Sequence, residues 1–306
     1  MSAGPVVGFV GLGRMGAPMA ANVARAGFPL VVHDRRPEAA EPLVAAGARW
    51  AADAAGCAAA ADVLVTMLPT PADVREVLLG TAGAGGAAGA LRPGSTWIDM
   101  STSTPEVAAE VRRVVEPRGV AVLDAPVAGM VAGARAGTLG IYVGGDAETL
   151  AACRPVLEAM GDPERILHIG PHGTGYVAKL CINLLWFMHE VAAAEVLSIG
   201  VRAGARLEAL QRAIVASPAT SQVVAQDLDR VWRDGDYDQS FPLALVCKDL
   251  GLATDLARAV GVPAEMTALT EQVFRRAMAT YGGDAGEMSA VRLYEDLTQT
   301  PLRYSA

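Results

Sequence analysis

Cysteine is scarce in this chain, and the cysteines present form no recognisable pattern. Four occur in 306 residues, and none belongs to a CxxC pair or to a Cys/His group with metal-ligand spacing. Closely spaced cysteines are typical of zinc sites and of small disulfide-bonded secreted domains. We therefore expect neither a disulfide framework nor a metal site. The cysteines are interpreted as reduced and mostly buried thiols: Cys57, Cys153, Cys181 and Cys247.

An excess of positive charge is also lacking. Lysine and arginine together number 25 against 33 aspartates and glutamates, which gives a formal net charge of -8. Phosphate backbones and anionic lipid surfaces repel such a protein, so we expect no nucleic-acid partner and no membrane partner. The N-terminal MSAGPVVGFV has no basic residues of the kind that open a signal peptide. These features predict a cytoplasmic location.

No long hydrophobic run is free of polar interruptions. The most hydrophobic stretch, residues 181–201, approaches membrane-spanning length, but His189, Glu190 and Glu195 interrupt it. Ionisable side chains are costly at membrane depth, so we predict a buried helix of a soluble protein. The composition, 52% hydrophobic and 19% charged, is typical of a well-packed globular protein, and the length predicts two domains.

The clearest motif lies within the first forty residues. An apolar run of strand type leads into GLGRMG (11–16), then a helix-like stretch, then a second apolar run that ends at Asp34. Strand, glycine turn, helix, strand and acid follow one another as in a dinucleotide-binding βαβ unit. Gly11 permits the tight turn, Gly13 lets the backbone approach a pyrophosphate, and Gly16 lets the helix pack against the strand. The pyrophosphate would lie on the free N–H groups of the helix N-terminus.

Asp34 indicates which dinucleotide binds. It lies 18 residues after Gly16, where a carboxylate accepts hydrogen bonds from the adenosine ribose and repels a 2′-phosphate. This predicts NAD, with NADP possible because Arg35 and Arg36 follow and a guanidinium can hold a 2′-phosphate. The alternative is that both arginines are solvated loop residues.

Helix-like and strand-like segments alternate over about the first 165 residues, which is the doubly wound pattern. Further strands are expected at 63–68, 96–100, 120–124 and 139–143. Because carboxyl ends of parallel strands line a ligand crevice, the residues after two of these strands are candidate cofactor contacts. The alternatives are a strand stop and a helix N-cap. With the residues of the glycine turn, the candidates are Leu12, Arg14, Met15, Met67, Leu68, Pro69, Ser101 and Thr102.

From residue 173 onward the pattern is helical throughout. Helices are expected at 175–204, 207–215, 221–233, 243–260, 264–281 and 287–298. We therefore predict an α/β fold class, with a Rossmann-type doubly wound parallel sheet domain over 1–170 and an all-helical domain over 171–306. The first of these helices is long enough to join the two.

Two later stretches carry candidate chemistry. Residues 124–139 contain Gly129, Gly133 and Gly137, and backbone that open can present N–H groups to a carboxylate, or can simply be a mobile loop. Lys179 lies four residues before Asn183, so both share one face of an otherwise apolar helix. A desolvated lysine is suited to acid/base work near neutral pH, whereas most lysines are merely solvated. The pair of Lys248 and Asp249, within another apolar helix, leaves the same two alternatives open.

Seven stretches together resemble the β-hydroxyacid dehydrogenase family, and most closely its 3-hydroxyisobutyrate dehydrogenase branch. They follow the family's order and cover nearly the whole chain: GFVGLGRMG (8–16), MLP (67–69), DMSTSTP (99–105), DAPVAG (124–129), GTLGIYVGG (137–145), GTGYVAKLCIN (173–183) and KDLGLA (248–253).

The resemblance implies a function as well as a fold. Lys179 would be the catalytic acid/base, Asn183 a substrate contact, and Lys248 a residue near the cofactor. A small-molecule 3-hydroxy acid would be oxidised reversibly to its 3-oxo form by metal-free hydride transfer to NAD or NADP. The helical domain would also drive assembly into a homodimer or homotetramer.

The chain departs from the family pattern at the expected substrate loop. The family usually has Ser-Gly-Gly where this chain has Ala128, Gly129 and Met130, and it has an asparagine pair where this chain has Asn183 and Leu184. A hydroxyl that helps to hold the substrate carboxylate is absent, and a bulky side chain replaces a glycine. Both departures make the pocket more apolar, so we expect a substituent larger or less polar than that of hydroxyisobutyrate.

Three rival functions fit part of the sequence. An imine reductase has a related fold, but such enzymes generally replace the lysine that is Lys179 here. A non-catalytic NAD(P)-binding module is disfavoured by the retained Lys179 and Asn183 and by the lack of basic tails. A phosphogluconate-type decarboxylating enzyme usually needs a longer helical domain and the asparagine pair.

Overall fold

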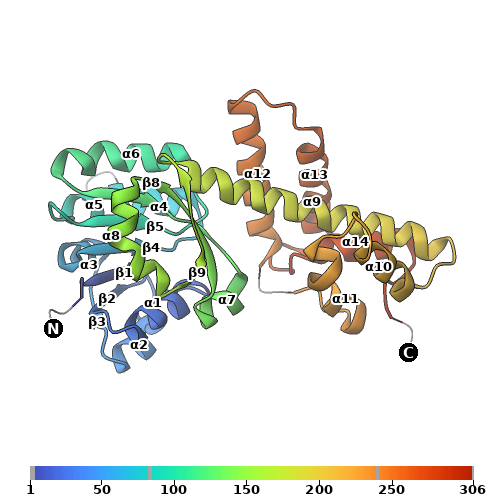
Figure 1. Ribbon diagram of the computed structural model, residues 1–306, viewed down its shortest axis with the longest axis horizontal. Coiled ribbons are helices and arrows are strands. Elements are labelled where there is room, and N and C mark those ends of the chain that lie inside the picture. The colour runs from blue at the N-terminus through green and yellow to red at the C-terminus, as the bar shows by residue number, and fades with distance from the viewer. Residues whose placement is uncertain (1–3, 82–84, 239–240, 305–306) are drawn as a thin grey trace. The chain divides into compact units, whose positions relative to one another are not determined.

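The computed structural model describes residues 4–81, 85–238 and 241–304 (Figure 1). The chain forms two compact units, residues 1–179 and 180–306, and each is described by itself below. All four cysteines are free thiols, and three of them are buried, as expected; Cys181 is exposed.

The first unit is built on one nine-stranded sheet with the order β3-β2-β1-β4-β5-β6-β8-β7, in which β9 pairs with β8. Strands β1 to β6 are all parallel, which confirms the predicted doubly wound sheet. Beyond β6 the sheet is mixed, because β8 runs antiparallel to both β6 and β7. The strands are β1 (Val7–Val10), β2 (Leu30–His33), β3 (Arg49–Trp50), β4 (Val63–Thr66), β5 (Thr96–Asp99), β6 (Ala121–Asp124), β7 (Val127–Ala128), β8 (Leu139–Gly145) and β9 (Gly161–Gly170).

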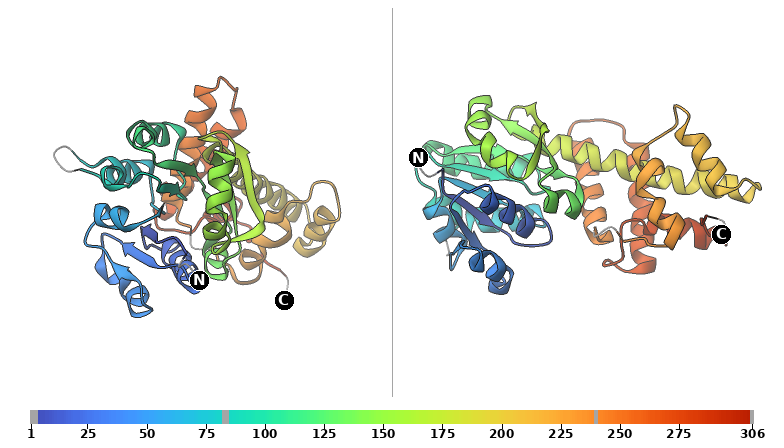
Figure 2. Two further views of the ribbon diagram at one scale, coloured as in Figure 1. Left: turned by 60° about the vertical axis from the view of Figure 1, so that its left-hand side comes forward. Right: turned by 60° about the horizontal axis from the view of Figure 1, so that its bottom comes forward.

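Helices cover both faces of this sheet (Figures 1 and 2). One face packs against α1, α2, α7 and α8, and the other against α3, α4, α5 and α6, so that apolar side chains fill two separate cores. Both faces are buried, which explains why the central strands are almost wholly apolar. The helices are α1 (Gly16–Arg25), η1 (Pro37–Ala40), α2 (Glu41–Ala45), α3 (Ala54–Ala60), α4 (Pro71–Leu79), α5 (Ala87–Ala90), α6 (Pro105–Val115), η2 (Glu116–Arg118), α7 (Met130–Ala136) and α8 (Ala147–Glu158).

The glycine-rich stretch 124–139 is not the open loop that its composition allows. It forms the short strand β7 and the helix α7, which begins after Gly129 and ends at Gly137. Packing decides the outcome, because Ala134 is fully buried and its carbonyl accepts a hydrogen bond of 2.7 Å from Asn22 on α1. Gly133 therefore lies inside a packed helix and does not present its N–H to a ligand.

Over residues 180–238 and 241–304 the second unit consists of helices joined by turns and loops, with an isolated antiparallel bridge between Pro242 and Gly286. Helix α9 (Thr174–Arg202) begins in the first unit and continues into the second, and four further helices agree with those predicted. The helix expected over 221–233 is instead divided into a π-helical turn and a short α-helix. The elements are α10 (Leu207–Val215), η3 (Val223–Asp227), α11 (Asp229–Asp234), α12 (Leu243–Ala259), α13 (Glu265–Tyr281) and α14 (Ser289–Thr298).

Helix α9 is long and apolar enough to cross a membrane by length and composition alone. Within the second unit, however, its side chains at 187, 194 and 197 are fully buried in the two cores that the other helices share. The helix therefore contributes to both cores of the helical unit, but only 39% of its most apolar window is buried, so the predicted buried helix is confirmed for one side of α9 and not for the whole of it.

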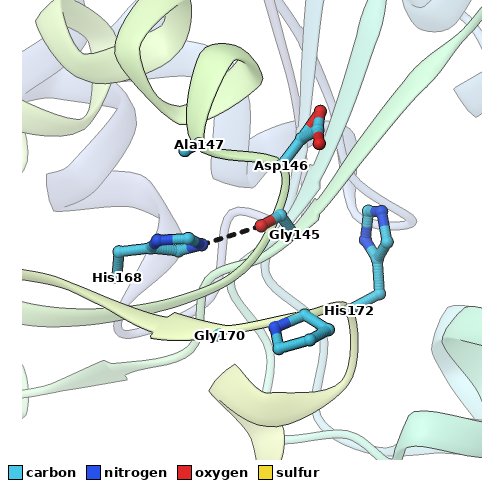
Figure 3. A pocket seen from close by; sticks show the side chains of 7 residues that line it. Gly145, Asp146, Ala147, His168, Gly170 and His172 are labelled. Carbon is cyan, nitrogen blue, oxygen red and sulfur yellow. Dashed lines mark hydrogen bonds between the residues drawn. The ribbon is translucent and has the colours of Figure 1, made fainter.

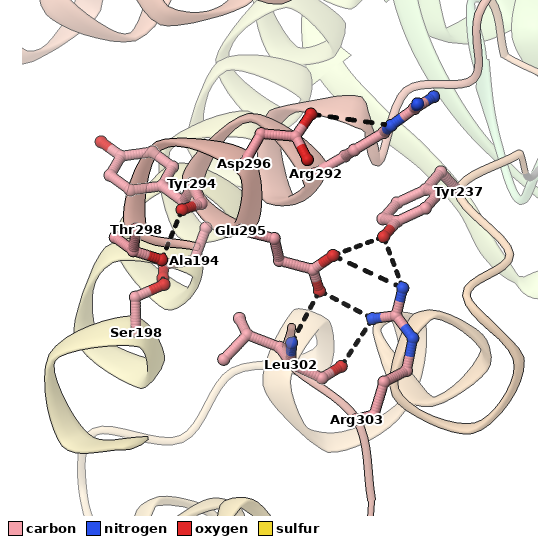
Figure 4. Close-up of polar contacts among 10 residues, drawn as sticks. All are labelled: Ala194, Ser198, Tyr237, Arg292, Tyr294, Glu295, Asp296, Thr298, Leu302 and Arg303. Atoms are coloured by element: carbon pink, nitrogen blue, oxygen red, sulfur yellow. Dashed lines mark hydrogen bonds and ion pairs between the residues drawn. The ribbon is translucent and has the colours of Figure 1, made fainter. Parts of the chain in front are cut away.

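A group of hydrogen bonds around Glu295 binds the segment that follows α14 to the helical unit (Figure 4). The carboxylate of Glu295 on α14 accepts hydrogen bonds from the Leu302 backbone N–H at 2.9 Å and from Arg303 at 2.7 Å. It also accepts one from the hydroxyl of Tyr237, which lies between α11 and α12. These contacts hold the segment after α14 against the rest of the unit.

Two buried carboxylates at the edge of the sheet hold the start of α9. Asp124, the last residue of β6, accepts hydrogen bonds from the backbone N–H groups of Gly173 at 2.7 Å and Gly175 at 2.8 Å. Asp99, the last residue of β5, accepts one from the hydroxyl of Tyr176 at 2.7 Å. The first N–H groups of a helix lack intrahelical partners and attract negative charge. The ends of β5 and β6 therefore fix the first turn of α9.

Burial makes this anchor sensitive to pH. Removal from water raises the pKa of Asp124 from 3.8 to about 6, against the opposing effect of the backbone hydrogen bonds from Gly173, Tyr176 and Gly175. Burial also raises the pKa of Asp99, against hydrogen bonds from Ser101, Tyr176 and Thr66. The anchor thus has an electrostatic cost that its hydrogen bonds only partly offset.

This cost predicts how stability depends on pH. Because the folded-state pKa of Asp124 is raised, its contribution to the free energy of unfolding is fully present below about pH 4 and is lost as the pH rises through about 6. The full change for this one group is about 3 kcal/mol. Urea denaturation of the wild type and Asp124→Asn should therefore differ more near pH 4 than near pH 7.

The exposed carboxylate of Asp255, on α12, offers the matched control. Asp255→Asn should differ from the wild type by a small amount at both pH values. A difference between the wild type and Asp124→Asn that is independent of pH would contradict the prediction.

Candidate active site

The glycine turn between β1 and α1 has the geometry that a dinucleotide needs. A Cβ atom on Gly11 would lie 2.3 Å from the carbonyl oxygen of Met67, and one on Gly16 would lie 1.9 Å from that of Gly11. Both positions therefore exclude any side chain. A Cβ on Gly13 would meet nothing within 4 Å, and the residue is exposed. The turn thus leaves open space at Gly13, where a pyrophosphate would approach the backbone.

Asp34 lies beside this turn at the end of β2. Its Oδ2 accepts a hydrogen bond of 2.7 Å from the backbone N–H of Leu12, and its Oδ1 accepts one of 2.9 Å from that of Arg36. Each carboxylate oxygen retains a further lone pair, so the group can still accept from a ribose diol. Arg35 is highly exposed and lies 3.9 Å from Asp73 on α4.

The cofactor contacts predicted at 67–69 and 101–102 follow strands that end at the same edge of the sheet, whereas Lys248 lies on α12 of the helical unit. The last residues of β1, β2, β4, β5 and β6 are in register, so the segments that follow them begin side by side. The backbone N–H of Leu68 donates a hydrogen bond of 2.9 Å to the hydroxyl of Ser101, which itself donates to Asp99 at 2.6 Å. Ser101 is fully buried, so its hydroxyl links the segments after β4 and β5.

Lys179 and Asn183 lie one turn apart on α9, as their spacing predicts, and both are half-buried. Lys179 follows the anchored first turn of the helix, so the hydrogen bonds that this turn donates to Asp99 and Asp124 also determine the backbone position of Lys179. Sequence reasoning missed these two aspartates as anchors. The available signal was an acid at the end of each of two adjacent strands together with the turn GTGY (173–176), which offers unpaired N–H groups.

The helical unit brings Asn183 and the Lys248–Asp249 pair together. The side-chain Nδ2 of Asn183 on α9 donates a hydrogen bond of 2.7 Å to Oδ2 of Asp249 on α12. The Nζ of Lys248 lies 2.9 Å from the other carboxylate oxygen, Oδ1, in an ion pair. Two motifs that are 65 residues apart in the sequence are therefore joined in one polar cluster.

The two residues of the expected substrate loop that depart from the family pattern, Ala128 and Met130, flank Gly129 at the junction of β7 and α7. Gly129 has a φ of +125° and is exposed. Met130, the next residue, has a φ of +57°, in the left-handed region that favours glycine. A non-glycine residue there carries backbone strain of roughly 1 kcal/mol or more, and such strain is often found at functional sites.

A hollow of about 360 Å³ lies elsewhere in the first unit, where β8 and β9 end and α8 begins (Figure 3). The Nε2 of His168 lies 2.8 Å from the carbonyl oxygen of Gly145. Burial, assisted by the charge of Arg112, lowers the pKa of His172. None of the predicted site residues lines this hollow, which is formed by Gly145, Asp146, Ala147, His168, Gly170, Pro171 and His172.

Comparison with family models covers nearly all of the chain. A model described as the NAD binding domain of 6-phosphogluconate dehydrogenase matches residues 6–170. A second, described as the NAD-binding domain of NADP-dependent 3-hydroxyisobutyrate dehydrogenase, matches residues 173–294.

Individual proteins are similar over most of their length. A NAD-dependent L-serine dehydrogenase of Pseudomonas aeruginosa is 38% identical, with 96% of this chain and 98% of that protein covered. A 3-hydroxyisobutyrate dehydrogenase of the same organism is 40% identical over 88% and 90%. The structure of Mycobacterium tuberculosis 3-hydroxyisobutyrate dehydrogenase with L-serine has a TM-score of 0.86 at 33% identity and covers 94% of this chain and 98% of that one.

Imine reductases share only the fold. The enzyme from Bacillus cereus has a TM-score of 0.59 at 20% identity, with 95% of this chain covered. The hydroxyacid dehydrogenases are thus nearer in both sequence and structure. With both family models matched in order and relatives of this similarity over most of its length, the chain belongs to the β-hydroxyacid dehydrogenase family.

Proposed function

We propose that this NAD(P)-dependent hydroxyacid dehydrogenase acts on a 3-hydroxy acid with Lys179 as its general acid/base. The observation that carries this proposal is the pair of Lys179 and Asn183 on one anchored helix, in which Asp249 binds Asn183. Residues 1–170 would bind the cofactor, and residues 171–306 would supply the substrate contacts and the assembly surface. We assign the enzyme to the cytoplasm.

The first unit fits a dinucleotide. The open space at Gly13 and the backbone N–H groups of the glycine turn would hold the pyrophosphate, and Asp34 would accept hydrogen bonds from the ribose, which favours NAD over NADP. The cofactor supplies the hydride acceptor of the oxidation. The remaining contacts proposed are those at 67–69, at 101–102 and at Lys248.

Lys179 would take the hydroxyl proton when the substrate is oxidised and return it when the carbonyl is reduced. Asn183, four residues later, would hold the reacting oxygen, so the two groups meet it from adjacent turns of one helix. Ala128, Gly129 and Met130 would face the carboxylate end and its neighbouring substituent. The role of the protein is thus to position the alcohol and to move one proton.

Replacement of Lys179 tests this assignment. Lys179→Ala should lower kcat by several orders of magnitude, because acid/base groups contribute about 10²–10⁴-fold and the substrate also loses a contact. Lys179→Arg keeps a positive charge but cannot release a proton, so it should be similarly inactive. Steady-state kinetics give kcat, and fluorescence titration should give a Kd for NAD close to that of the wild type. Turnover near that of the wild type in either variant would refute the proposal.

The substrate is proposed to carry a substituent larger or less polar than the methyl group of 3-hydroxyisobutyrate. The names of three relatives specify L-serine, 3-hydroxyisobutyrate and 2-(hydroxymethyl)glutarate, which differ chemically in the third substituent beside the hydroxymethyl and carboxylate groups. Ala128 offers no hydroxyl and Met130 adds apolar surface, which favours an apolar substituent at that position.

A substrate panel measures this preference. It should contain 3-hydroxy acids with hydrogen, methyl, larger alkyl, amino and carboxyethyl substituents, and a cyclic imine, each with NAD and with NADP. We expect the highest kcat/KM for an alkyl-substituted acid with NAD. Ala128→Ser/Met130→Gly should shift the preference towards the smaller and more polar acids, while Met266→Gly, at an exposed position on α13, should not. Preference for the imine would support the rival reductase instead.

Assembly is proposed to use an exposed apolar stripe on α9. Four large side chains form two pairs, each pair three residues apart, and the second pair follows the first at 14 residues, which is two heptads; Leu185 and Ile199 are 55% and 62% exposed. Such spacing of apolar residues is typical of a helix that packs against another helix. A second copy of this chain supplies an identical stripe and so forms a symmetric pair. The four residues are Ile182, Leu185, Val196 and Ile199.

Light scattering after gel filtration tests the stripe. The wild type should have the mass of a dimer or tetramer, and Ile199→Glu should shift it towards the monomer, because a charge would be buried at the seam. Val262→Glu, an exposed apolar residue outside α9, is the control and should leave the mass unchanged. A monomeric wild type, or an Ile199→Glu variant of unchanged mass, would contradict the proposal.

A further inference from the structure

Asp249 is a buried carboxylate between two elements of the proposed site. Its side chain is 2% exposed, and its neighbours on α12, Val246 and Leu250, are fully buried. Oδ2 lies 2.7 Å from Nδ2 of Asn183, and Oδ1 lies 2.9 Å from Nζ of Lys248. A carboxylate in such surroundings is costly unless both of its oxygens have partners. Asn183 supplies a hydrogen-bond partner for Oδ2, whereas Oδ1 is compensated by the charge of Lys248 and accepts no hydrogen bond among the described residues.

The chemistry of this contact fixes the orientation of the Asn183 amide. An ionised carboxylate can only accept hydrogen bonds, whereas the amide has a donor end and an acceptor end. Asp249 therefore requires the NH₂ group, and not the carbonyl oxygen, to face α12. One of the two N–H bonds is directed at Oδ2, and the second N–H is left in a defined direction away from Asp249.

We propose that Asp249 is a positioning residue that orients Asn183 so that this second N–H donates to the reacting oxygen of the substrate. The inference rests on the proposed function for the role of Asn183. The reacting oxygen is an acceptor both as a hydroxyl and as a carbonyl, and it gains negative character as its proton leaves. A donor fixed at this position, beside Lys179, stabilises that oxygen in both directions of the reaction.

The positive charge of Lys248 would determine how an amide at position 249 is oriented. If position 249 carried an amide, its carbonyl oxygen would turn to the ammonium of Lys248 and its NH₂ group would turn to Asn183. Asn183 would then have to rotate its own carbonyl oxygen towards position 249. The group presented to the reacting oxygen would change from a donor to an acceptor, which would repel it.

Asp249→Asn tests this exchange in a double-mutant cycle with Asn183→Ala. In the wild-type background, Asp249→Asn should lower kcat/KM for the hydroxy acid about tenfold or more, since a hydrogen bond to a developing charge is lost. In the Asn183→Ala background the same change should have little further effect, because Asp249 acts through Asn183. Asp255→Asn, at a 71% exposed position on the same helix, is the control and should match the wild type. Equal effects in both backgrounds, or no effect in either, would overturn the proposal.

A second measurement does not depend on activity. The side-chain amide signal of Asn183 can be identified in NMR spectra of the wild type by its absence from Asn183→Ala. If Asp249 binds this group, its amide protons should exchange slowly with solvent and should shift when Asp249 is replaced by asparagine. Rapid exchange in the wild type would overturn the orientation. Wild-type protein that oxidises none of the hydroxy acids would instead refute the proposed function, and the amide signal would still decide the orientation.

Discussion

The binding of the start of α9 by Asp99 and Asp124 is the constraint on which the rest of the site depends. The two carboxylates end adjacent parallel strands, β5 and β6, and accept hydrogen bonds from the first turn of the helix. Helix N-termini attract negative charge, so the contact satisfies N–H groups that would otherwise lack partners. Burial of the carboxylates costs free energy, as the raised pKa of Asp124 indicates. The free-energy cost of burying these carboxylates thus accompanies the contacts that fix the position of α9.

Helix geometry carries this constraint from the sheet to the proposed chemistry. Lys179 lies one turn beyond the anchored residues and Asn183 one turn further, at a rise of about 6 Å between them. In the helical unit, Asp249 holds Asn183 from a separate element, and the apolar cores hold the middle of α9. The pair is therefore fixed by three buried carboxylates on three elements, none of which is adjacent to it in sequence.

The features predicted correctly from the sequence are those with a local physical cause. Gly11 and Gly16 leave no room for a side chain, so their spacing identifies the turn, and apolar periodicity identifies α9, α12 and α13.

The features that were not predicted depend on contacts between distant segments or on exposed strands. Residues 124–139 were misjudged because glycine permits both an open loop and a helix end, and the contact from Asn22 on α1 decides between them. Strand β9 was missed because it contains exposed polar residues such as Glu164 and Arg165 and lacks the regular alternation of apolar and polar residues that indicates a strand. The bond between Asn183 and Asp249 joins distant segments, so only the fold reveals it.

The arrangement separates the proposed chemistry from the proposed specificity. Lys179 and Asn183 belong to α9, whose position depends on buried carboxylates. Ala128 and Met130 belong to the junction of β7 and α7, where Met130 adopts a φ that favours glycine. A backbone conformation of this kind lowers stability, so we attribute the presence of methionine at this position to its side chain. Because the two sets lie on different elements, the residues that face the variable part of a substrate can change without displacing those that act on its hydroxyl group.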